Sequence, residues 1–285
     1  MDLKELSQKI KAVLLGDVRK LIMDARGGNM VVVEEKKDGD SATEADIKIG
    51  NMLGELGKAL IPDSLIIEEE TFGAAAYETL RLNPAYVWVI DPIDGTKAFR
   101  TSGNNEYCVV VALLHHMRPV LSLLYAPEYE GGLLFEAIEG EDGITLNGEK
   151  WNSLPLADRH DIPCVSHVST DTALNDMEKA VQSLFETKEM IRAYNGHSTA
   201  INYALVAKDK LQRVFTRRDV NLWDSVQGAY LVEKLGGKVF YADGTDVFPI
   251  DINLLTFGGN KLRLPFNIAC HPDLKQDILE RISRM

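Results

Sequence analysis

The sequence predicts an α/β protein in which an α+β N-terminal half packs on an α/β C-terminal half. Two helical patterns followed by a series of short strands occupy the chain up to Trp151, and helices and strands alternate after it. Consecutive short strands are typical of an antiparallel sheet, and regular alternation is typical of helices layered on a sheet. With 285 residues, 45% of them hydrophobic, the chain can bury a large core, as one big domain or as two closely packed halves.

In the first half, apolar residues recur with helical spacing from about Leu3 to Met23 and again from Thr43 to Leu60. Strand-like apolar runs follow at Ile66, Val87, Cys108–Leu114, Pro119–Tyr125 and Leu133–Ile138. Turn residues come after them at Glu139–Gly143 and Asn147–Gly148. We therefore expect two helices and then an antiparallel sheet.

In the second half, strand and helix patterns alternate. Strands are expected at Cys164–Val168, Ile191–Tyr194, Leu211–Phe215 and Val239–Tyr241, and helices at Leu174–Phe185, Ser198–Lys208 and Ser225–Leu235. The pattern changes between Asn147 and Asp161, although no Gly/Ser linker marks the place. We therefore predict two halves, residues 1–152 and 153–285.

Composition narrows the functional classes. A net charge of −12 excludes a general nucleic-acid binder, but not phosphorylated substrates, because bound magnesium reverses the local sign of charge. No apolar run approaches the ~18 residues of a membrane span, and no signal-peptide pattern is present. The three cysteines lie in apolar segments and are expected to be reduced core residues. These features favour a cytoplasmic protein that acts on a small molecule, away from membranes and nucleic-acid polymers.

The most informative stretch is Val87–Thr96. An apolar run typical of a buried strand ends at Asp91, and the proline after it forces the backbone out of regular structure, so that Asp91 and Asp94 can converge. Such oxygen ligands suit a hard cation such as magnesium. Gly95 lets a ligand approach the main chain, and the Gly95 and Thr96 amides, if at a helix start, would attract an anion. The alternative is a solvated turn, because these residues are common turn formers.

Three other segments end in acidic residues. A polar loop leads through Thr43 to Asp46, an apolar run ends in Glu68-Glu69-Glu70, and Asp224 precedes a helical pattern that ends at Gly236-Gly237. Each segment also has a purely structural explanation. Thr43 and Asp46 fit a capping box, the three glutamates fit a solvated strand end, and Asp224 fits an acidic residue that the helix dipole favours in the first turn.

In this order and with these flanks, the segments resemble the inositol monophosphatase superfamily, whose members are magnesium-dependent, lithium-sensitive phosphomonoesterases. The first signature of the family resembles Trp88–Phe99, and the second resembles Trp223-Asp224 with its following Gly236-Gly237. The resemblance spans nearly the whole chain and implies a layered αβαβα sandwich. No Gly-x-Gly-x-x-Gly follows a strand, which argues against a Rossmann-type dehydrogenase.

The resemblance also implies roles for individual residues. The first metal would be held by Glu69, Asp91 and the carbonyl of Ile93, and the second by Asp91, Asp94 and Asp224, with two or three Mg²⁺ ions per site. Glu68 takes the place of the small or polar residue that usually precedes Glu-Glu in the family, which selects Glu69. Asp46 and Thr96, with Glu69, are the implied catalytic residues, because the first two resemble the pair that orients and helps deprotonate the attacking water. Substrate contacts are implied for Gly95, Thr96, Lys97, His197, Ser198, Arg217 and Asp224.

Substrate identity depends on smaller details. Lys97, Tyr125-Ala126-Pro127 and Asn221 look closer to the 3′(2′),5′-bisphosphate nucleotidase branch, which converts adenosine 3′,5′-bisphosphate to AMP and phosphate. Arg217 takes the place where the inositol branch typically has a glutamate, and a cation there can pair with a second phosphate. The counter-interpretation is that Arg217 and Arg218 only solvate a loop.

Other functions stay open at this point. They are an inositol-1-monophosphatase or related sugar-phosphate phosphatase, and a catalytically idle binding protein on the same fold; the enzyme would be a monomer or a homodimer. The turn around Gly196 is longer than usual in the family, and the segment Leu254–Pro265 matches no family feature.

Overall fold

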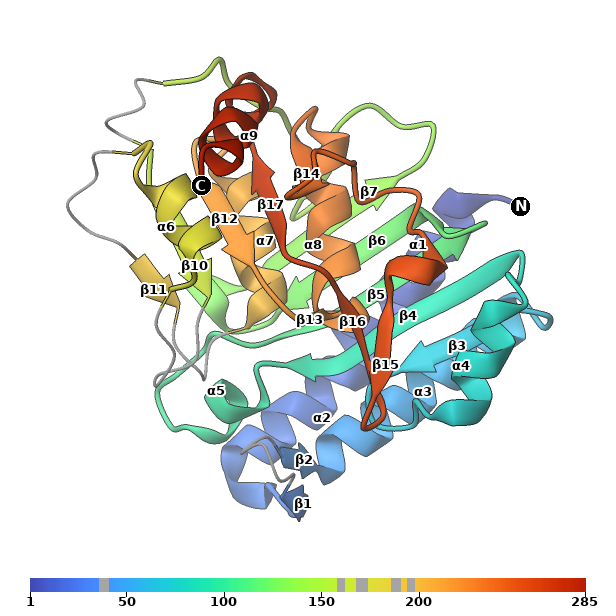
Figure 1. Ribbon diagram of the computed structural model, residues 1–285. Helices are drawn as coiled ribbons and strands as arrows, with labels where there is room; N and C mark the ends of the chain where they lie inside the picture. Colours follow the sequence, from blue (N-terminus) through green and yellow to red (C-terminus); the bar gives the residue numbers. More distant parts are fainter. Residues whose placement is uncertain (36–40, 158–161, 168–173, 186–190, 194–197) are drawn as a thin grey trace.

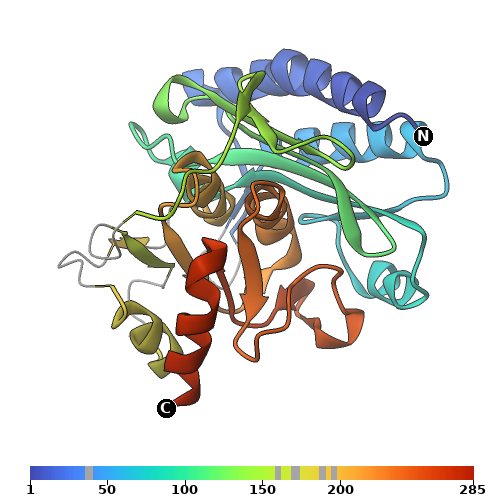
Figure 2. The same cartoon turned by 90° about the horizontal axis from the view of Figure 1, so that it is seen from above.

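Five alternating layers of helices and sheets make up the computed structural model, as the sequence implied (Figures 1 and 2). The structure describes residues 1–35, 41–157, 162–167, 174–185, 191–193 and 198–285. Seen from above in Figure 2, the N-terminal helices cover a large sheet, two helices lie beneath that sheet, and a second sheet with its own outer helices follows.

The first layer contains the N-terminal helices. Helix α1 (Leu3–Val13) continues through a π-turn (Leu14–Val18), α2 (Arg19–Asp24) and a second π-turn (Ala25–Asn29), so the helix runs past the predicted end at Met23. Its buried side chains, Leu6, Ile10, Leu14, Val18 and Ile22, recur every four residues and face the sheet. Helix α3 (Glu44–Leu60) begins as predicted, with Thr43 as its cap. A short hairpin, β1 (Val32–Glu35) and β2 (Ser41–Thr43), precedes it.

The second layer is a seven-stranded sheet whose spatial order follows the sequence. Its strands are β3 (Leu65–Glu68), β4 (Tyr86–Asp94), β5 (Cys108–His115), β6 (Arg118–Ala126), β7 (Leu133–Ile138), β8 (Ile144–Leu146) and β9 (Glu149–Trp151). The predicted antiparallel pairing is found throughout except between β3 and β4, which are parallel because α4 (Ala74–Arg81), a helix that the sequence did not predict, connects them. The carboxyl ends of β3 and β4 therefore meet at one edge.

The third layer contains α7 (Thr199–Lys208) and α8 (Leu222–Lys234), which are apolar on nearly all sides because they lie between two sheets. Below them is a five-stranded sheet, in the order β11 (Ile191–Ala193), β10 (Cys164–His167), β12 (Val214–Arg217), β17 (Asn267–Cys270), β14 (Lys238–Tyr241). Helices α6 (Asp176–Gln182) and α9 (Lys275–Ser283) form the outer layer. Short 3₁₀ turns lie at Tyr129–Gly131, Ile252–Leu254 and Pro272–Leu274.

Two boundaries differ from the prediction in ways that matter for the site. Strand β12 begins at Val214 instead of Leu211, because Lys210 and Leu211 have positive φ angles of 55° and 68° and form a turn. Helix α8 begins at Leu222, so Asp224 lies inside its first turn and does not precede it. Strand β17 and helix α9 were not predicted.

The segment Leu254–Pro265, which matched no family feature, forms most of a three-stranded sheet. Strand β16 (Lys261–Leu264) is its centre, between β13 (Val220–Asn221) and β15 (Thr256–Gly258). Phe257 stacks on Tyr77 of α4 with ring centroids 4.5 Å apart, and Phe72 bridges from Phe257 to Trp223. The hairpin is thus fixed against the start of α8.

We propose to divide the chain into halves 1–152 and 153–285, because β9, the last strand of the first sheet, ends at Trp151 and β10 begins at Cys164. One hydrophobic cluster contains side chains from both halves, such as Val110 and Val226, so the halves share a core. The three cysteines are buried and free, as expected. Among the described residues, no helix combines the length and apolar character that crossing a bilayer requires.

Candidate metal centre and active site

The end of β4 carries the first two acidic residues of the candidate site. Proline 92 has no N–H to donate, and the pairing of β4 with β5 shifts register between Asp91 and Asp94. Asp91 is 1% exposed, and its Oδ1 accepts a hydrogen bond from the Ile93 N–H at 2.9 Å. The irregular strand end therefore fixes the direction of the Asp91 carboxylate.

The glutamates after β3 divide into different environments. Glu68 is buried, and its carboxylate accepts hydrogen bonds from the Glu70 N–H at 3.1 Å and the Thr71 hydroxyl at 2.7 Å, which close the turn after the strand. Glu69 is half-buried, and its N–H donates to the Ile90 carbonyl of β4 at 3.3 Å. This bond places Glu69 beside Asp91 at the shared strand edge.

Asp224 reaches the same place from α8. Its Oδ2 accepts a hydrogen bond at 3.2 Å from the amide of Asn221, the residue before the helix. Carboxylate oxygens of Glu69, Asp91 and Asp224 lie within 4.8 Å of one another, although the three residues come from different parts of the chain.

This group has the chemistry of a site for a hard cation. Burial, and then the charges of Glu69, Asp94 and Asp224, raise the pKa of Asp91 well above its usual value. Carboxylates held this close repel one another unless protons or a cation compensate them, and their donors are all oxygen. The residues present therefore fit magnesium.

Asp94 lies outside this group of three. Its Oδ2 accepts hydrogen bonds from the Ser198 hydroxyl at 2.5 Å and the Ala200 N–H at 2.6 Å, so it helps to cap α7. Burial raises the pKa of Asp94 to about 6, against the lowering effect of these hydrogen bonds. Its predicted second-metal role, like the role of the Ile93 carbonyl, stays a prediction.

Asp46 and Thr96, the two residues predicted to orient and deprotonate the attacking water, are both fixed by hydrogen bonds to nearby residues. Asp46 is 1% exposed, and its Oδ2 accepts from the Thr43 N–H at 2.8 Å and the Thr43 hydroxyl at 2.5 Å, which is the predicted capping box. Burial raises the pKa of Asp46 to about 7, although these hydrogen bonds oppose the increase. The Thr96 hydroxyl donates to the Ile93 carbonyl at 3.0 Å.

The backbone conformation at position 95 requires a glycine. Its φ of 88° lies in the left-handed region, and a Cβ there would lie 2.8 Å from the Glu106 carbonyl oxygen. Helix α5 (Thr96–Arg100) begins directly after it, as the sequence suggested, with Lys97 exposed.

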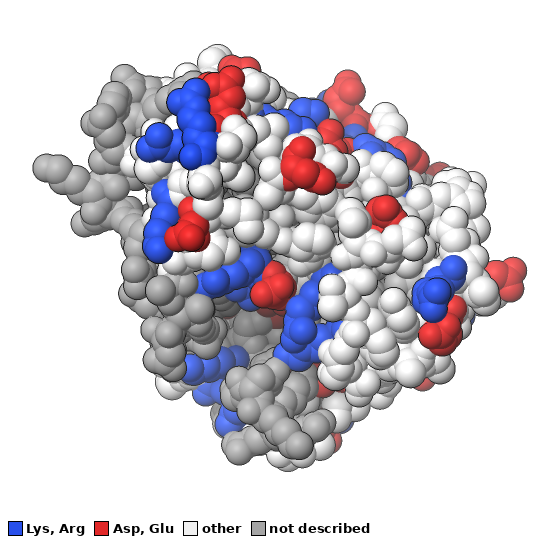
Figure 3. All heavy atoms as spheres, in the orientation of Figure 1, with Lys and Arg blue, Asp and Glu red and all other residues white. Residues whose placement is uncertain are grey.

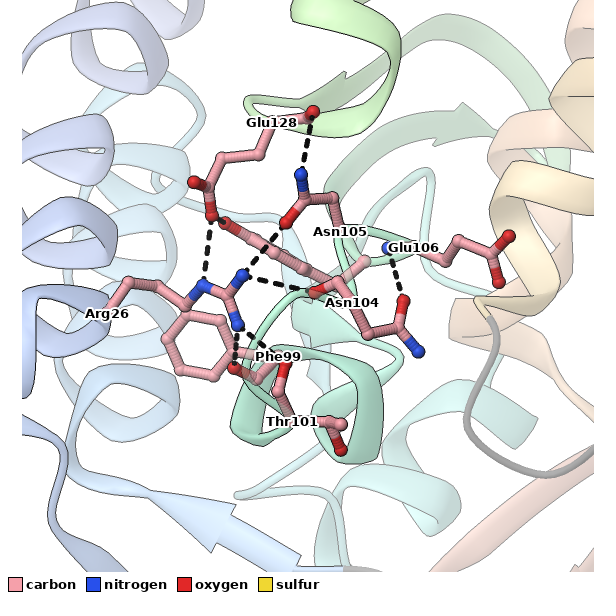
Figure 4. Close-up of polar contacts among 8 residues, drawn as sticks. Arg26, Phe99, Thr101, Asn104, Asn105, Glu106 and Glu128 are labelled. Atoms are coloured by element: carbon pink, nitrogen blue, oxygen red, sulfur yellow. Dashed lines mark hydrogen bonds and ion pairs between the residues drawn. The ribbon is translucent and has the colours of Figure 1, made fainter.

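A partly buried arginine that belongs to no sequence motif holds the segment after α5. The guanidinium of Arg26, at the end of the N-terminal helix, points into the loop that follows α5 (Figure 4). It donates at 2.8–3.1 Å to the carbonyls of Phe99, Thr101 and Asn104 and to the side chains of Asn105 and Glu128. The Glu106 carbonyl at the end of this loop accepts from the Ser198 N–H at 3.0 Å, so the network joins the first layer to α5 and α7.

The predicted substrate residues lie in several environments. Arg217 ends β12, where burial lowers its pKa and the negative charges of Asp224 and Asp94 act in the opposite direction. It therefore lies among the acidic residues of the site, and Arg218 pairs with the buried Glu178 at 3.6 Å. Ser198 is buried as the cap of α7. His197 lies outside the described residues.

We expect the metal-free protein to unfold at a lower temperature at pH 8 than at pH 5.5. The pKa values of Asp46 and Asp94, about 7 and about 6, exceed the usual 3.8, so the folded state binds more protons than the unfolded state in this range. The stability that this protonation contributes is lost as the pH rises through the folded-state pKa values. Calorimetry with a chelator should show a decrease of roughly 5 °C or more in Tm.

Magnesium provides the control for this pH effect. It should raise Tm clearly at pH 8 and little at pH 5.5, because protons compete for the same oxygens. The Asp91→Asn variant, which has one fewer buried carboxyl, should show a shallower pH dependence without metal. A metal-free Tm that is equal or higher at pH 8 would contradict the assigned shifts.

Comparison with known proteins identifies relatives across almost the whole chain. The sequence profile described as "Inositol monophosphatase family" matches residues 2–268. The 3′(2′),5′-bisphosphate nucleotidase CysQ of Escherichia coli O157:H7 is 26% identical over 218 residues, covering 75% of this chain and 81% of that protein. Inositol monophosphatase 3 of Solanum lycopersicum is 28% identical over 222 residues, covering 75% and 78%. Among solved structures, an IMPase/NADP phosphatase complexed with Mg²⁺ and phosphate superimposes with a TM-score of 0.73 at 20% identity, covering 98% and 95%.

Proposed function

The chain belongs to the inositol monophosphatase family and is a phosphoric monoester hydrolase that depends on a divalent cation, and from this premise we propose that it is a 3′(2′),5′-bisphosphate nucleotidase. The proposed reaction converts adenosine 3′,5′-bisphosphate to AMP and phosphate. The observation that carries the phosphatase assignment is the convergence of Glu69, Asp91 and Asp224 within 4.8 Å. Three converging carboxylates, one of them buried, are costly without a cation, which argues against an idle binding protein.

We propose that Glu69, Asp91, Asp94, Asp224 and the Ile93 carbonyl hold two or three Mg²⁺ ions. When bound, such ions lower the pKa of a bound water and offset the charge of a phosphate. Asp46 is the proposed proton acceptor for this water. Both hydrogen bonds that its carboxylate accepts from Thr43 use Oδ2, so Oδ1 is the proposed acceptor of the proton. The pKa of Asp46, raised to about 7, suits a base that works near neutral pH.

Around this centre, Thr96 is proposed to position the water together with Asp46, since its hydroxyl is held by the Ile93 carbonyl. The amides of Gly95 and Thr96 and the exposed Lys97 are proposed contacts of the phosphate that is cleaved. His197 and Ser198 are kept as proposed contacts of the rest of the substrate. Nothing in this scheme needs a Ser, Cys or His nucleophile.

The nucleotide substrate is favoured by the CysQ relative and by Arg217, a cation beside the carboxylates where inositol-cleaving relatives typically have an acid. The second candidate is an inositol monophosphate or a related sugar phosphate, favoured by the plant relative of 28% identity. We further propose a cytoplasmic enzyme, monomeric or homodimeric, that acts on free small molecules, since a net charge of −12 does not suit a nucleic-acid polymer.

We expect adenosine 3′,5′-bisphosphate to be hydrolysed with a higher kcat/KM than inositol 1-phosphate in the presence of Mg²⁺. Phosphate release measured on both substrates, with product identification as AMP, tests the assignment. A parent enzyme that prefers inositol 1-phosphate would show that the inositol branch is correct.

The Arg217→Gln variant tests whether Arg217 contributes to this substrate preference. If Arg217 contacts the uncleaved phosphate, its loss should lower kcat/KM for the bisphosphate by about ten- to a hundredfold, because a charge-assisted hydrogen bond contributes about 1.5–3 kcal/mol. Inositol 1-phosphate, which has no second phosphate, should be affected much less. Equal losses on both substrates would mean that Arg217 acts through Asp94 and Asp224.

A further inference from the structure

Strand β16 presents two cations on one face. Lys261 and Arg263 alternate with Leu262 and Leu264, which are 0% and 2% exposed and belong to the central hydrophobic cluster. Because successive side chains of a strand point to opposite faces, Lys261 and Arg263 lie on the face away from that core.

This placement is not the usual protection of a sheet edge. Lysine and arginine often occur on edge strands, where their charge prevents pairing with another chain. Strand β16 is the middle strand of its sheet, paired on both sides with β13 and β15. Edge protection therefore does not account for the cations on it.

Arg263 lies directly beside the candidate metal site. It pairs with Asn221 in the antiparallel register of β13 and β16, and residues paired in this way lie about 5 Å apart and project from the same face. The Asn221 amide donates to Oδ2 of Asp224 at 3.2 Å, so this face is the one that looks toward the converging carboxylates.

The surface view agrees with this arrangement. Figure 3 shows basic atoms on two sides of a hollow in this face, one group over the end of β12 and the other over β16, with acidic atoms between them. Arg217 is the last residue of β12, and Arg218, which pairs with Glu178, follows it. In a chain whose net charge is −12, two cationic groups on opposite sides of one hollow favour an anionic ligand that extends beyond the carboxylates.

We propose that Arg263, assisted by Lys261, determines specificity by binding the anionic group of the substrate that is not cleaved, so that the enzyme selects bisphosphorylated substrates. This inference rests on the proposed phosphatase function of the same site. A planar guanidinium can bind a phosphate through two parallel hydrogen bonds, whereas a lysine acts as a point charge. Of the two cations on β16, Arg263 is therefore the stronger determinant and Lys261 the weaker one, and both act together with Arg217, the contact proposed above.

The test compares adenosine 3′,5′-bisphosphate with adenosine 3′-monophosphate, which differ only in the uncleaved phosphate. Arg263→Met keeps the aliphatic stem and removes the charge, Arg263→Lys keeps the charge, and Lys150→Ala removes a cation at the far edge of the large sheet. Arg263→Met should lower kcat/KM for the bisphosphate by about ten- to a hundredfold, mainly through KM, and that for the monophosphate by less than about threefold. Arg263→Lys should lie between Arg263→Met and the parent, and Lys150→Ala should match the parent.

Equal changes on both nucleotides, or no change on either, would overturn the role of Arg263. If the nucleotides are not turned over, the proposed nucleotidase function fails, and the same variants are measured on inositol 1-phosphate and inositol 1,4-bisphosphate. A loss confined to the bisphosphate would then uphold the role of Arg263, and a parent that prefers the monophosphate in the pair that it hydrolyses would exclude it. Failure to turn over either pair would reject both proposals.

Discussion

The Asp91→Asn variant is expected to lose at least about a hundredfold in kcat at saturating Mg²⁺, because metal ions contribute several kcal/mol to such reactions. Asp91 is the residue proposed to contact both metals, and its carboxylate lies at the centre of the three converging groups. Asparagine retains one oxygen but removes the charge, so the nucleophile side and the leaving-group side of the site are weakened together. Phosphate release by the purified variant measures the effect.

Folding of this variant should be preserved. Asparagine keeps the Oδ1 that accepts the Ile93 N–H, and it removes a carboxyl whose pKa burial and like charges raise. The metal-free variant should therefore unfold at a temperature equal to or higher than the parent at pH 8. Asp176→Asn, at an exposed carboxylate on α6, is the matched control and should retain parental turnover. An Asp91→Asn variant with more than a few per cent of parental turnover would reject the two-metal assignment.

Exhaustive chelation is expected to abolish hydrolysis, and Mg²⁺ is expected to restore it. Without a cation, the carboxylates of Glu69, Asp91 and Asp224 repel a phosphate as well as one another. Calcium should bind and inhibit, because it is larger and tolerates irregular coordination. Lithium should inhibit as well, as the resemblance to the inositol monophosphatase superfamily implies.

Melting temperatures measured during a Mg²⁺ titration show whether activity is lost through loss of the metal or through unfolding of the protein. Titration of the chelated protein with Mg²⁺ at pH 8 should raise Tm in parallel with the recovery of activity. The Asp91→Asn variant should show a much smaller Tm increase over the same titration. Unchanged turnover after chelation would exclude a metal-dependent mechanism.

Local patterns in the sequence were sufficient for much of the secondary structure. The apolar run before Asp91 forms β4, the Thr43–Asp46 pair forms the capping box of α3, and Gly236 ends α8 with a φ of 86°. Each of these features depends on residues within one or two turns of one another, so the sequence is enough to specify it. The family resemblance added the five-layer order, which the structure confirms.

Other elements depend on contacts between distant residues. The parallel pairing of β3 with β4 requires α4, whose sequence Ala74–Arg81 has only one fully buried residue, Leu80, and so gave little periodic signal. The strands β15 and β16 are short and were missed, because their stability comes from packing of Phe257 on Tyr77 and Phe72. Arg26 has no motif, since its partners all lie more than seventy residues away in the sequence.

By itself, the sequence determined which carboxylates were candidates and what they would bind, because strand ends, caps and turns are local and oxygen donors imply a hard cation. Only the tertiary structure decided that Glu69, Asp91 and Asp224 meet and that Arg263 lies beside Asn221. Those facts follow from the pairing of β3 with β4 in the large sheet and of β13 with β16 in the three-stranded sheet, which brings residues far apart in the chain close together. Such pairing depends on the packing of the whole core, which no local pattern encodes.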